Sequence, residues 1–457
     1  MKTFLDRIAE QLRIERQLNS VQPVFLTVYG RRRCGKSALL NHLKKPKDVF
    51  FQCDQQEETI QRNLLAQEIA NQYPGFSEVN YPSWESLLNN LNKYLSAQST
   101  LFLDEFPYLV KSSPSFPSVL QRLIDQKKLQ YNLVICGSSQ QMMQGLIMDS
   151  KSPLYGRTDD IIRILPLKAG WIQEGLGLEP IQAIEEYAVW GGVPRYWVLR
   201  SKQANFESAV ANLLLNSESL LYEEPMRLFL DDMRSAVQTH SIMLLAGSGT
   251  TRQSEFATRL EKSATSLARP LAALIEMGYL RRELPFGENE KNSKRGLYKI
   301  NDPFMRFHYR FVIANKSRIE GGMNDRVIEE WKKNFGQFIG ETWEQLCREA
   351  LPFLKINNQD WDVARRWWGN VAAKVEFELD VVSESMDKKT LLIGECKWSD
   401  NPNIKTICKN LDDKIKQFPL TNKRKIQKVL FLKQETKEVL PKDYFVVTPQ
   451  SILNALR

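Results

Sequence analysis

Short apolar runs alternate with amphipathic segments over the first third of the chain. The runs that we expect to form buried strands are residues 24–29, 49–53, 99–103 and 132–137. The segments with helical spacing of apolar residues are 4–17, 57–73, a segment capped by Ser83, and 115–129. Strands that alternate with helices are joined by right-handed crossovers into a parallel sheet. This part of the sequence therefore predicts an α/β domain whose ligand lies at the carboxyl ends of the strands.

The pattern changes twice after residue 170. From residue 171 to about 227 the spacing is mostly helical, with a marked break at Gly191 and Gly192, and we expect a helical lid packed on the N-terminal core. The next segments predict three helices and then a hairpin around a charged turn. We expect the helices at 236–246, 252–260 and 263–277, and the strands of the hairpin at 279–284 and 296–300. Three helices followed by a hairpin are typical of a winged helix-turn-helix.

The last part of the chain begins with a helical pattern at residues 338–351 and continues into extended runs at 371–382 and 390–398. Side chains alternate between the two faces of a strand. The alternation predicts that Glu376, Glu378 and Asp380 share one face, and that Glu395 and Lys397 share a face of the following strand.

The junction of the first strand and the next helix reads Gly30-Arg-Arg-Arg-Cys-Gly-Lys-Ser37. It matches the phosphate-binding loop G-x-x-x-x-G-K-[ST], in which glycines let backbone amides face the phosphates. We expect Lys36 to reach the β and γ phosphates of ATP and Ser37 to hold Mg²⁺. A glycine-rich surface turn is the alternative, and the flanking strand and helix disfavour it. The residues expected to bind the nucleotide are Gly30, Arg31, Arg32, Arg33, Cys34, Gly35, Lys36, Ser37 and Ala38.

Two carboxylates follow the third apolar run. We expect Asp104 to bind the same Mg²⁺ and Glu105 to polarise the attacking water. Ser138 ends the next strand, where it either contacts the γ phosphate or water, or only caps the strand. Arg157 and Arg195 are candidates for stabilising transition-state charge, with a structural role as the alternative.

A second set of charged residues follows from the strand faces near the C-terminus. If those faces meet, Asp380 and Glu395 share a divalent metal, Mg²⁺ or Mn²⁺, with the Cys396 carbonyl. Lys397 would then orient or activate the attacking water, and the metal would stabilise the pentacovalent phosphate. Glu344, on the preceding helix, is the candidate that completes the site.

A surface hairpin with alternating charges is the alternative for this region. It explains Glu376 well, but Glu395 and Lys397 follow an apolar run that predicts a buried strand. A basic stretch downstream suits a nucleic-acid backbone, although a solvated helix is the usual reason for such a stretch. Its members are Lys405, Lys409, Lys414, Lys416, Lys423, Arg424, Lys425 and Lys428.

Composition restricts the class of protein without identifying it. The chain has 457 residues, 42% hydrophobic and 26% charged, as in ordinary globular proteins of about two to four domains. A net charge of +9 makes a polyanionic partner plausible. Six cysteines without a C-x-x-C pair, and no long apolar run, predict a cytoplasmic protein with reduced thiols and no membrane association. The three widely spaced histidines argue against a histidine-rich zinc site.

Several motifs together resemble the archaeal-type ATPases, P-loop proteins near the AAA+ and STAND groups. The matching stretches are 30–37, 103–109, 136–139, 154–157 and 191–194. Residues 302–311 and 394–398 look like the C-terminal domain of unknown function that is often fused to them, which is similar to PD-(D/E)XK nucleases. Two features depart from the pattern: Ser138 stands where many AAA+ relatives have asparagine, and no arginine finger is assignable.

The resemblance implies ATP hydrolysis, a winged helix and a metal-dependent nuclease fold. The domains we expect are a P-loop ATPase core at 1–170, a helical lid at 171–230, a winged helix-turn-helix at 231–315 and a restriction-endonuclease-like α/β domain at 316–457. The function we expect couples an ATP switch to binding of nucleic acid, in particular DNA, and its cleavage. The alternatives are a regulatory ATPase whose nuclease fold only clamps nucleic acid, and a protein-interaction NTPase. A homo-oligomer or a protein partner stays open.

Overall fold

The computed structural model describes residues 4–233, 235–290, 293, 295–371, 375–421 and 424–457, with the side chains of 370–371 and 375–376 left aside. The described residues form two compact units. The N-terminal unit contains residues 4–166 and the short segment 230–233, and the C-terminal unit contains residues 167–229 and 235–457. Each unit is built around its own mainly apolar core.

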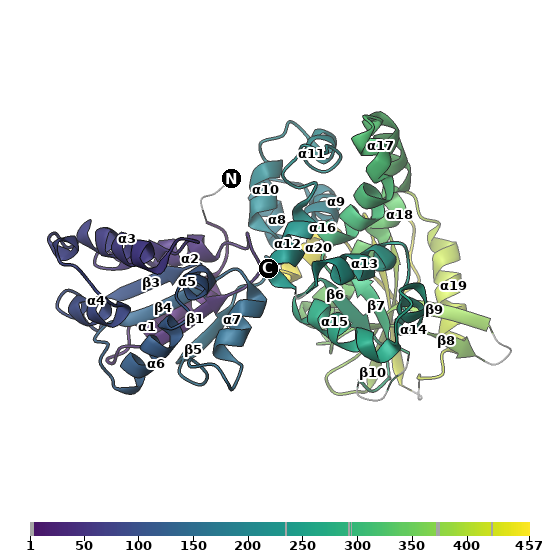
Figure 1. Cartoon of the computed structure of the whole chain (residues 1–457). Coiled ribbons are helices and arrows are strands. Elements are labelled where there is room, and N and C mark those ends of the chain that lie inside the picture. The colour runs from purple at the N-terminus through teal and green to yellow at the C-terminus, as the bar shows by residue number, and fades with distance from the viewer. Residues whose placement is uncertain (1–3, 234, 291–292, 294, 372–374, 422–423) are drawn as a thin grey trace. The chain divides into compact units, whose positions relative to one another are not determined.

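A five-stranded parallel sheet forms the centre of the N-terminal unit (Figure 1). Its strands are β1 (Phe25–Tyr29), β2 (Val49–Gln52), β3 (Thr100–Asp104), β4 (Asn132–Gly137) and β5 (Asp160–Arg163). Their order across the sheet is β2-β3-β4-β1-β5. The first four strands confirm the prediction from the apolar runs. The edge strand β5 was not predicted, because its four residues begin with Asp160 and end with Arg163, so that they lack a clear apolar run.

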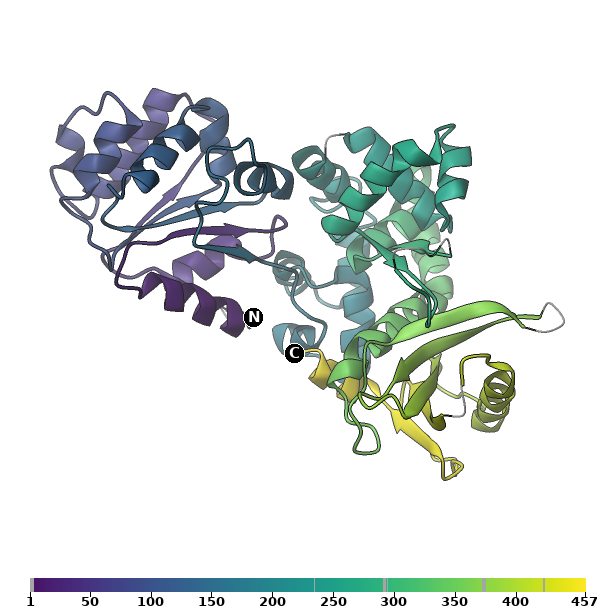
Figure 2. The same cartoon turned by 90° about the horizontal axis from the view of Figure 1, so that it is seen from below.

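Helices cover both faces of this sheet. They are α1 (Ile8–Leu18), α2 (Lys36–Leu43), α3 (Glu58–Ala70), α4 (Trp84–Leu91), α5 (Phe106–Ser112), α6 (Phe116–Asp125) and α7 (Gln140–Ile147). The helices α3 to α6 bury apolar side chains in one cluster with β2, β3 and β4, whereas α1 packs with α2. Figure 2 shows α1 on the opposite side of the sheet from α3 and α4. Residue Ser83 caps α4, as predicted.

The helices that follow residue 167 belong to the C-terminal unit. They are α8 (Gly170–Leu176), α9 (Pro180–Trp190), α10 (Pro194–Arg200), α11 (Phe206–Leu213) and α12 (Glu224–Asp232), and the last of these ends in the N-terminal unit. We expected a lid packed on the N-terminal core. Instead, α9 packs on α16 (Pro303–Phe307), α18 (Asn324–Ala350) and α20 (Pro449–Ala455). The reason is its apolar face, which buries Ile184, Ala188 and Val189 in this unit.

Three helices and an antiparallel hairpin come next, at the predicted positions. They are α13 (Ala236–Gly247), α14 (Gln253–Arg259), α15 (Ala264–Glu276), β6 (Leu280–Glu283) and β7 (Leu297–Ile300). Ser263 caps α15 by accepting a hydrogen bond from the Ser266 N–H at 3.2 Å, and the helix continues through Pro270. A π-helical turn, η2 (His308–Val312), the short η3 (Ile313–Asn315) and α17 (Lys316–Glu320) lead to the long helix α18.

A mixed sheet forms the last part of the C-terminal unit. Its strands are β8 (Arg365–Val371), β9 (Val375–Glu384), β10 (Thr390–Lys397), β11 (Lys425–Leu432) and β12 (Tyr444–Val447). Their order across the sheet is β12-β11-β10-β9-β8. The pairs β8–β9 and β9–β10 are antiparallel, whereas β10–β11 and β11–β12 are parallel. The crossover helix α19 (Ile404–Gln417) packs on one face, and α18 packs on β9 and β10.

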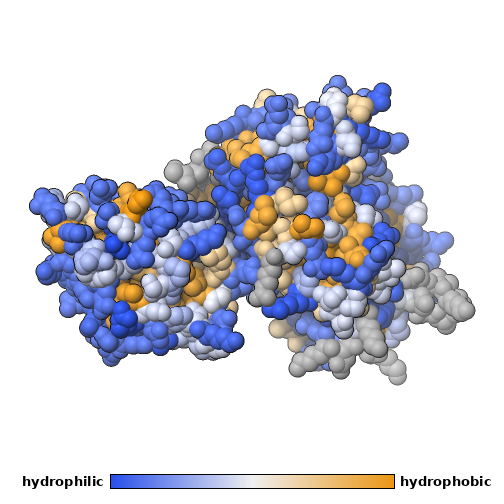
Figure 3. All heavy atoms as spheres, viewed as in Figure 1, coloured by the Kyte–Doolittle hydropathy of each residue, from blue (hydrophilic) through white to orange (hydrophobic). Residues whose placement is uncertain are grey.

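The face of each unit that Figure 3 shows is mainly hydrophilic. On the face drawn in Figure 3, hydrophilic side chains cover most of each unit and apolar side chains occur in small groups. None of the helices in the described ranges is long and apolar enough to cross a bilayer.

Candidate functional site

Two glycines shape the loop between β1 and α2. Gly30 lies against the residue that follows β5, and a Cβ atom at its position would come 2.2 Å from the Ile164 carbonyl oxygen. Gly35 has a φ of +90° and lies directly before the first residue of α2. The two glycines of the motif are therefore required by close approach and by backbone conformation, and the loop leads straight into a helix N-terminus.

Lys36 lies inside this loop. Its ammonium group donates hydrogen bonds to the carbonyl oxygens of Gly30 at 2.9 Å and of Arg31 at 3.1 Å, and only 5% of the residue is exposed. The loop thus curls around the charged end of its own lysine.

Ser37 and Asp104 meet at the carboxyl ends of β1 and β3. The Ser37 hydroxyl donates to Asp104 Oδ2 at 2.5 Å, and Asp104 is 2% exposed. The backbone N–H of Glu105 donates to Asp104 Oδ1 at 3.0 Å, which fixes the second carboxylate oxygen. A serine hydroxyl beside a buried carboxylate is an oxygen donor set that suits Mg²⁺. The residues present therefore fit the magnesium ion that accompanies a nucleotide.

Glu105 is held by the end of the neighbouring strand. Its backbone has a φ of 52°, and its Oε2 accepts hydrogen bonds from the Ser138 hydroxyl at 2.8 Å and the Ser138 N–H at 3.2 Å. We considered two roles for Ser138, contact with the γ phosphate or water and capping of the strand. In the structure its hydroxyl and N–H instead hold the Glu105 carboxylate.

Two further arginines of the N-terminal unit, Arg32 and Arg157, pair with carboxylates of the same unit. Arg32 forms an ion pair with Asp231 at 3.0 Å, and Arg157 forms one with Asp125 at 2.8 Å. Arg195 lies in the C-terminal unit and is exposed. Arg7 was missed by the sequence analysis, yet its guanidinium donates to the carbonyl oxygens of Cys34 at 3.0 Å and Leu165 at 2.6 Å. Its signal was weak, because a single arginine before a helix carries no spacing pattern.

In the C-terminal unit, Asp380, Glu395 and Lys397 come together where the ladder between β9 and β10 ends. The Asp380 carboxylate accepts a hydrogen bond from the Cys396 N–H at 2.8 Å. Lys397 donates to one oxygen of Glu395 at 2.8 Å, and Lys414 of α19 donates to the other at 2.9 Å. The regular alternation assumed for β9 breaks down here, because Leu379 and Val382 both face the core cluster under α19.

Three carboxylates influence one another at this place. Burial raises the pKa of Asp380 to about 7, and the neighbouring charges of Glu395 and Glu344 add to the effect. Arg348 of α18 donates to the Asp380 carbonyl oxygen at 2.8 Å and lies 3.6 Å from a Glu344 oxygen. Among the residues that the structure describes, no group of three or more His, Cys, Asp or Glu side chains is arranged to hold a metal ion. Each oxygen of Glu395 instead accepts a hydrogen bond from a lysine, Lys397 or Lys414.

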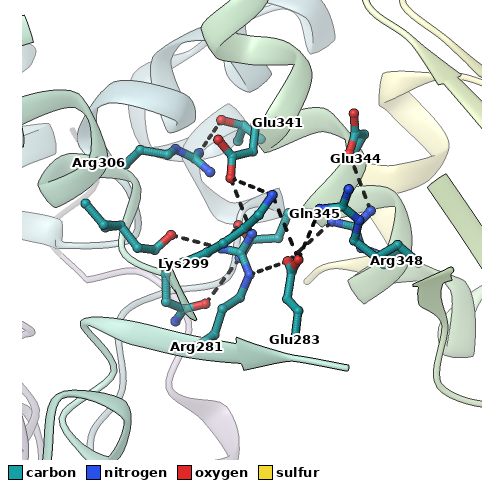
Figure 4. Close-up of polar contacts among 12 residues, drawn as sticks. Arg281, Glu283, Lys299, Arg306, Glu341, Glu344, Gln345 and Arg348 are labelled. Carbon is teal, nitrogen blue, oxygen red and sulfur yellow. Dashed lines mark hydrogen bonds and ion pairs between the residues drawn. The ribbon is translucent and has the colours of Figure 1, made fainter. Parts of the chain in front are cut away.

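An ion cluster joins the hairpin β6–β7 to α18 near these residues (Figure 4). Its centre is Glu283, at the end of β6, whose side chain is 11% exposed. The cations within 4 Å of its carboxylate are Arg281 (2.8 Å), Arg366 (3.4 Å), Arg348 (3.8 Å) and Lys299 (3.9 Å). Burial acts to raise the pKa of Glu283, but these four cations lower it well below its ordinary value.

Basic side chains also occur on α15, on the hairpin β6–β7 and in the basic stretch that begins at Lys405. Arg281, Arg282 and Arg295 are engaged within the unit, by Glu283, the Ser293 carbonyl and Glu288 respectively. Arg269 on α15 is exposed, as are Lys405, Lys409 and Lys416, although Lys416 pairs with Asp413. The residues Lys291, Lys294 and Lys423, and the side chain of Glu376, lie outside the described residues. Glu378 pairs with Arg366.

The parallel sheet and its loop define a P-loop ATPase domain, and comparison with known families gives the type. Residues 4–196 match a family described as an ATPase domain predominantly from Archaea. Residues 308–409 match a second family, described as archaeal and bacterial proteins of unknown function. The chain therefore carries an archaeal-type ATPase domain followed by a domain of that second family.

Individual proteins resemble the chain over most of its length. An uncharacterized protein of Methanocaldococcus jannaschii is 28% identical over 444 residues, which cover 95% of this chain and 97% of that protein. Among solved structures, a Walker-type ATPase of Pyrococcus abyssi is 19% identical, covers 67% of this chain and 96% of that one, and has a TM-score of 0.48. The ORC2 protein of Aeropyrum pernix, in ADPNP and ADP complexes, is 13% identical, with 71% and 97% covered and a TM-score of 0.45.

Proposed function

We propose that the N-terminal unit binds ATP with Mg²⁺ and hydrolyses it. The observation that carries this proposal is the 2.5 Å contact between Ser37 and Asp104 beside the loop that encloses Lys36. Three parts needed to bind a nucleoside triphosphate, namely amide donors, a lysine and oxygen ligands for the metal, lie at one edge of the sheet.

Each residue then has a defined task. Lys36 exchanges its two carbonyl partners for phosphate oxygens, and Ser37 and Asp104 hold Mg²⁺, which neutralises charge on the phosphates. Glu105, kept in place by Ser138, accepts a proton from the attacking water or orients it. Arg7 keeps the loop in shape through the Cys34 carbonyl.

The first test is the variant Lys36→Ala. We expect loss of ATP turnover and at least a tenfold weaker affinity for ATP, because a charge-assisted contact to phosphate is worth about 1.5–3 kcal/mol. Lys44→Ala, an exposed lysine at the end of α2, is the matched control and retains activity. Phosphate release and calorimetry with ATP measure the two effects. Unchanged turnover in Lys36→Ala contradicts the assignment of the loop.

We further propose that the C-terminal unit binds DNA and cleaves its phosphodiester bonds with a divalent metal, under control of the ATPase domain. The proximity of Glu344, Asp380 and Glu395 supports this, because a raised carboxyl pKa beside other carboxylates is common at functional sites. The helices α13, α14 and α15 with the hairpin β6–β7 support a winged helix, in which the exposed Arg269 would face DNA.

The residues of this second site have the chemistry that cleavage needs. Asp380 and Glu395 supply oxygen ligands, and a metal bound there would offset negative charge on the phosphorus centre. Lys397 orients the attacking water, and its pKa is raised: burial acts to lower it, but Glu395 outweighs that effect. The lysine therefore stays charged at neutral pH.

The test is cleavage of plasmid and single-stranded DNA with Mg²⁺ or Mn²⁺, with and without ATP. We expect metal-dependent cutting that disappears in Lys397→Ala and persists in Lys355→Ala, an exposed lysine outside the basic stretch. A response to ATP shows that the ATPase domain controls the reaction.

A regulatory ATPase with a silent nuclease fold is the second candidate. The observation that favours it is the pairing of both Glu395 oxygens with Lys397 and Lys414, because two ammonium groups already neutralise the charge that would attract a metal. Retained DNA binding without cutting under any of these conditions would select this candidate.

A further inference from the structure

A cavity of about 470 Å³ lies inside the C-terminal unit, away from the P-loop. Its walls come from the end of α13, from β7, from α16 and η2, from the middle of α18, and from β8 and β9. This volume falls in the range of about 300–1,000 Å³ that small-ligand sites occupy. The polar side chains that line it include Lys299, Arg306, Arg310, Gln337, Glu341 and Arg366.

Arg306 is the residue in this wall whose hydrogen-bonding capacity is least used. It is 6% exposed, its Nη2 donates to the Thr342 hydroxyl, and its guanidinium lies 5.3 Å from the centre of the Phe338 ring. Its Nε and Nη1 atoms have no hydrogen-bond partner among the described residues. Burial lowers the pKa of Arg306, since the charged form has lost water. Buried donors of this kind are normally paired, and an anion would pair them.

The carboxylates nearby are already shared among several cations (Figure 4). Glu341 lies 3.3 Å from Lys299 and 3.8 Å from Arg281. Burial acts to raise the pKa of Glu341, but Arg306, Lys299 and Arg281 lower it to about 2. Glu341 is therefore ionised, yet one carboxylate serves three cations. The other carboxylates of the cluster, Glu283 and Glu378, are likewise paired with arginines.

Counted with Arg310, the cations of the cluster outnumber its carboxylates by one. The other cations are Arg281, Lys299, Arg306, Arg348 and Arg366, and the carboxylates are Glu283, Glu341, Glu344, Glu378 and Asp302, whose charge also acts on Arg306. Arg310, which also lines the cavity, is exposed and adds a further positive charge.

We propose that this cavity binds a phosphate group carried by a nucleotide unit. The Arg306 guanidinium offers two unpaired donors, Nε and Nη1, which point in different directions, so that each can donate a charge-assisted hydrogen bond to a separate oxygen. Arg310 supplies a second cation, and Gln337 supplies an amide for the sugar or base. Gly247 and Gly249 line the same cavity without side chains that would narrow it.

The phosphate has two sources with the same chemistry, a nucleic-acid strand and a free mononucleotide. Glu344 lines the cavity and acts on the charge of Asp380, so a strand whose phosphate contacts Arg306 would lead toward the proposed cleavage residues. The proposal that a nucleic-acid strand binds here therefore rests on the proposed nuclease function, whereas the proposal of a bound mononucleotide does not.

The experiment uses the full chain with Lys36→Ala, so that the P-loop does not contribute phosphate binding, and contains no divalent metal, so that cleavage does not occur. The probes are inorganic phosphate, AMP and a labelled oligothymidine of about 12 nucleotides. Calorimetry and fluorescence anisotropy give the dissociation constants.

Two substitutions remove donors and one removes a competing charge. We expect Arg306→Gln and Arg310→Ala each to weaken binding about tenfold, as for loss of a charge-assisted contact. Glu341→Gln should tighten binding severalfold, because a competing carboxylate is gone. The matched control is Arg326→Ala, an exposed arginine earlier on α18 that does not line the cavity. Thermal unfolding checks that Arg306→Gln is folded, and the exposed Arg310 gives an independent variant.

Every outcome decides the proposal. Tightest binding of the oligothymidine, with losses in both arginine variants, supports a strand, and tightest binding of AMP with the same losses supports a mononucleotide. The proposal is overturned if none of the probes binds saturably. It is also overturned if a folded Arg306→Gln and Arg310→Ala both bind the probes like the control, or if Glu341→Gln does not bind them more tightly. If the losses are seen but the natural chain cuts no DNA, the phosphate site stands and the nuclease proposal fails.

Discussion

Ser138, which follows β4, fixes the side chain that we propose to act on the attacking water. Its hydroxyl and its backbone N–H both donate to the same oxygen of Glu105, whose backbone adopts a left-handed conformation that a glutamate rarely takes. The carboxylate is thus fixed before any water approaches it.

Removal of the hydroxyl should therefore slow ATP hydrolysis without weakening ATP binding. For Ser138→Ala we expect a fall in kcat of about tenfold with KM nearly unchanged, since one of two hydrogen bonds to Glu105 is lost. Ser138→Thr keeps the hydroxyl and should retain most of the activity. A parallel rise in KM in Ser138→Ala would show that Ser138 contacts the nucleotide instead.

The hairpin β6–β7 is the element that joins the helices α13 to α15 to the mixed sheet. Its charged residues face inward, onto α18 and β8, through Glu283 and the cations around it (Figure 4). Arg281 also donates a hydrogen bond to Gln345 of α18 at 2.8 Å. The described part of the hairpin therefore orders the C-terminal unit.

The ion cluster also makes stability depend on pH in a defined direction. Glu283 has a lowered pKa in the folded state, so its contribution is fully present above the unfolded pKa of about 4.3 and is lost as pH falls toward the folded pKa. We expect Glu283→Gln to cost about 3 kcal/mol at pH 7, as for a broken buried ion pair. The difference in free energy of unfolding between natural and variant chains should shrink between about pH 5 and pH 3.

Denaturant unfolding at several pH values measures this difference. Glu290→Gln is a control, since Glu290 lies in the exposed turn of the same hairpin and pairs only with Arg365 among the partners described. A constant difference across the pH range would mean that Glu283 contributes through packing alone.

At the scale of the whole molecule, the C-terminal end of α12 belongs to the first unit, although the helices α8 to α11 belong to the second. Asp231 pairs with Arg32 of the P-loop and accepts from the Ser139 hydroxyl through its carbonyl, and Asp232 accepts from the N–H of Gln140 at 3.1 Å. Gln140 is the first residue of α7, where the backbone donors lack helical partners. The end of α12 therefore completes the nucleotide-binding unit.

Loss of this cap should loosen the first unit and leave the second unchanged. We expect Asp232→Ala, at a residue 2% exposed, to destabilise the first unit by about 1–2 kcal/mol, because it leaves a buried N–H unpaired. Asp231→Ala, which removes a half-exposed ion pair, should cost less. Hydrogen exchange should quicken in residues 139–145 and stay constant in β8 to β12. Equal quickening in both units would show that they unfold together.

Much of the first unit follows from sequence alone. An apolar strand, the glycine loop, Lys36 and Ser37 lie within about twenty residues, and their local pattern is enough to predict the turn that they form. Asp104 was predictable because the carboxyl ends of parallel strands meet at one edge. The same logic predicted the three helices and hairpin of the second unit, since each has its own spacing and its own end signals.

Tertiary structure decided everything that depends on contacts between distant segments. The apolar face of α9 has the same pattern whichever unit buries it, so only packing assigned residues 167–229 to the C-terminal unit. Lys414 and Glu395 lie on different elements, and no spacing rule brings a helix lysine onto a strand carboxylate. The local pattern of this sequence determined which elements form and where the phosphate loop lies, because those interactions are short in range. The strand order, the pairing of the buried charges and the cavity at Arg306 arise from long-range packing, and only the folded chain specifies them.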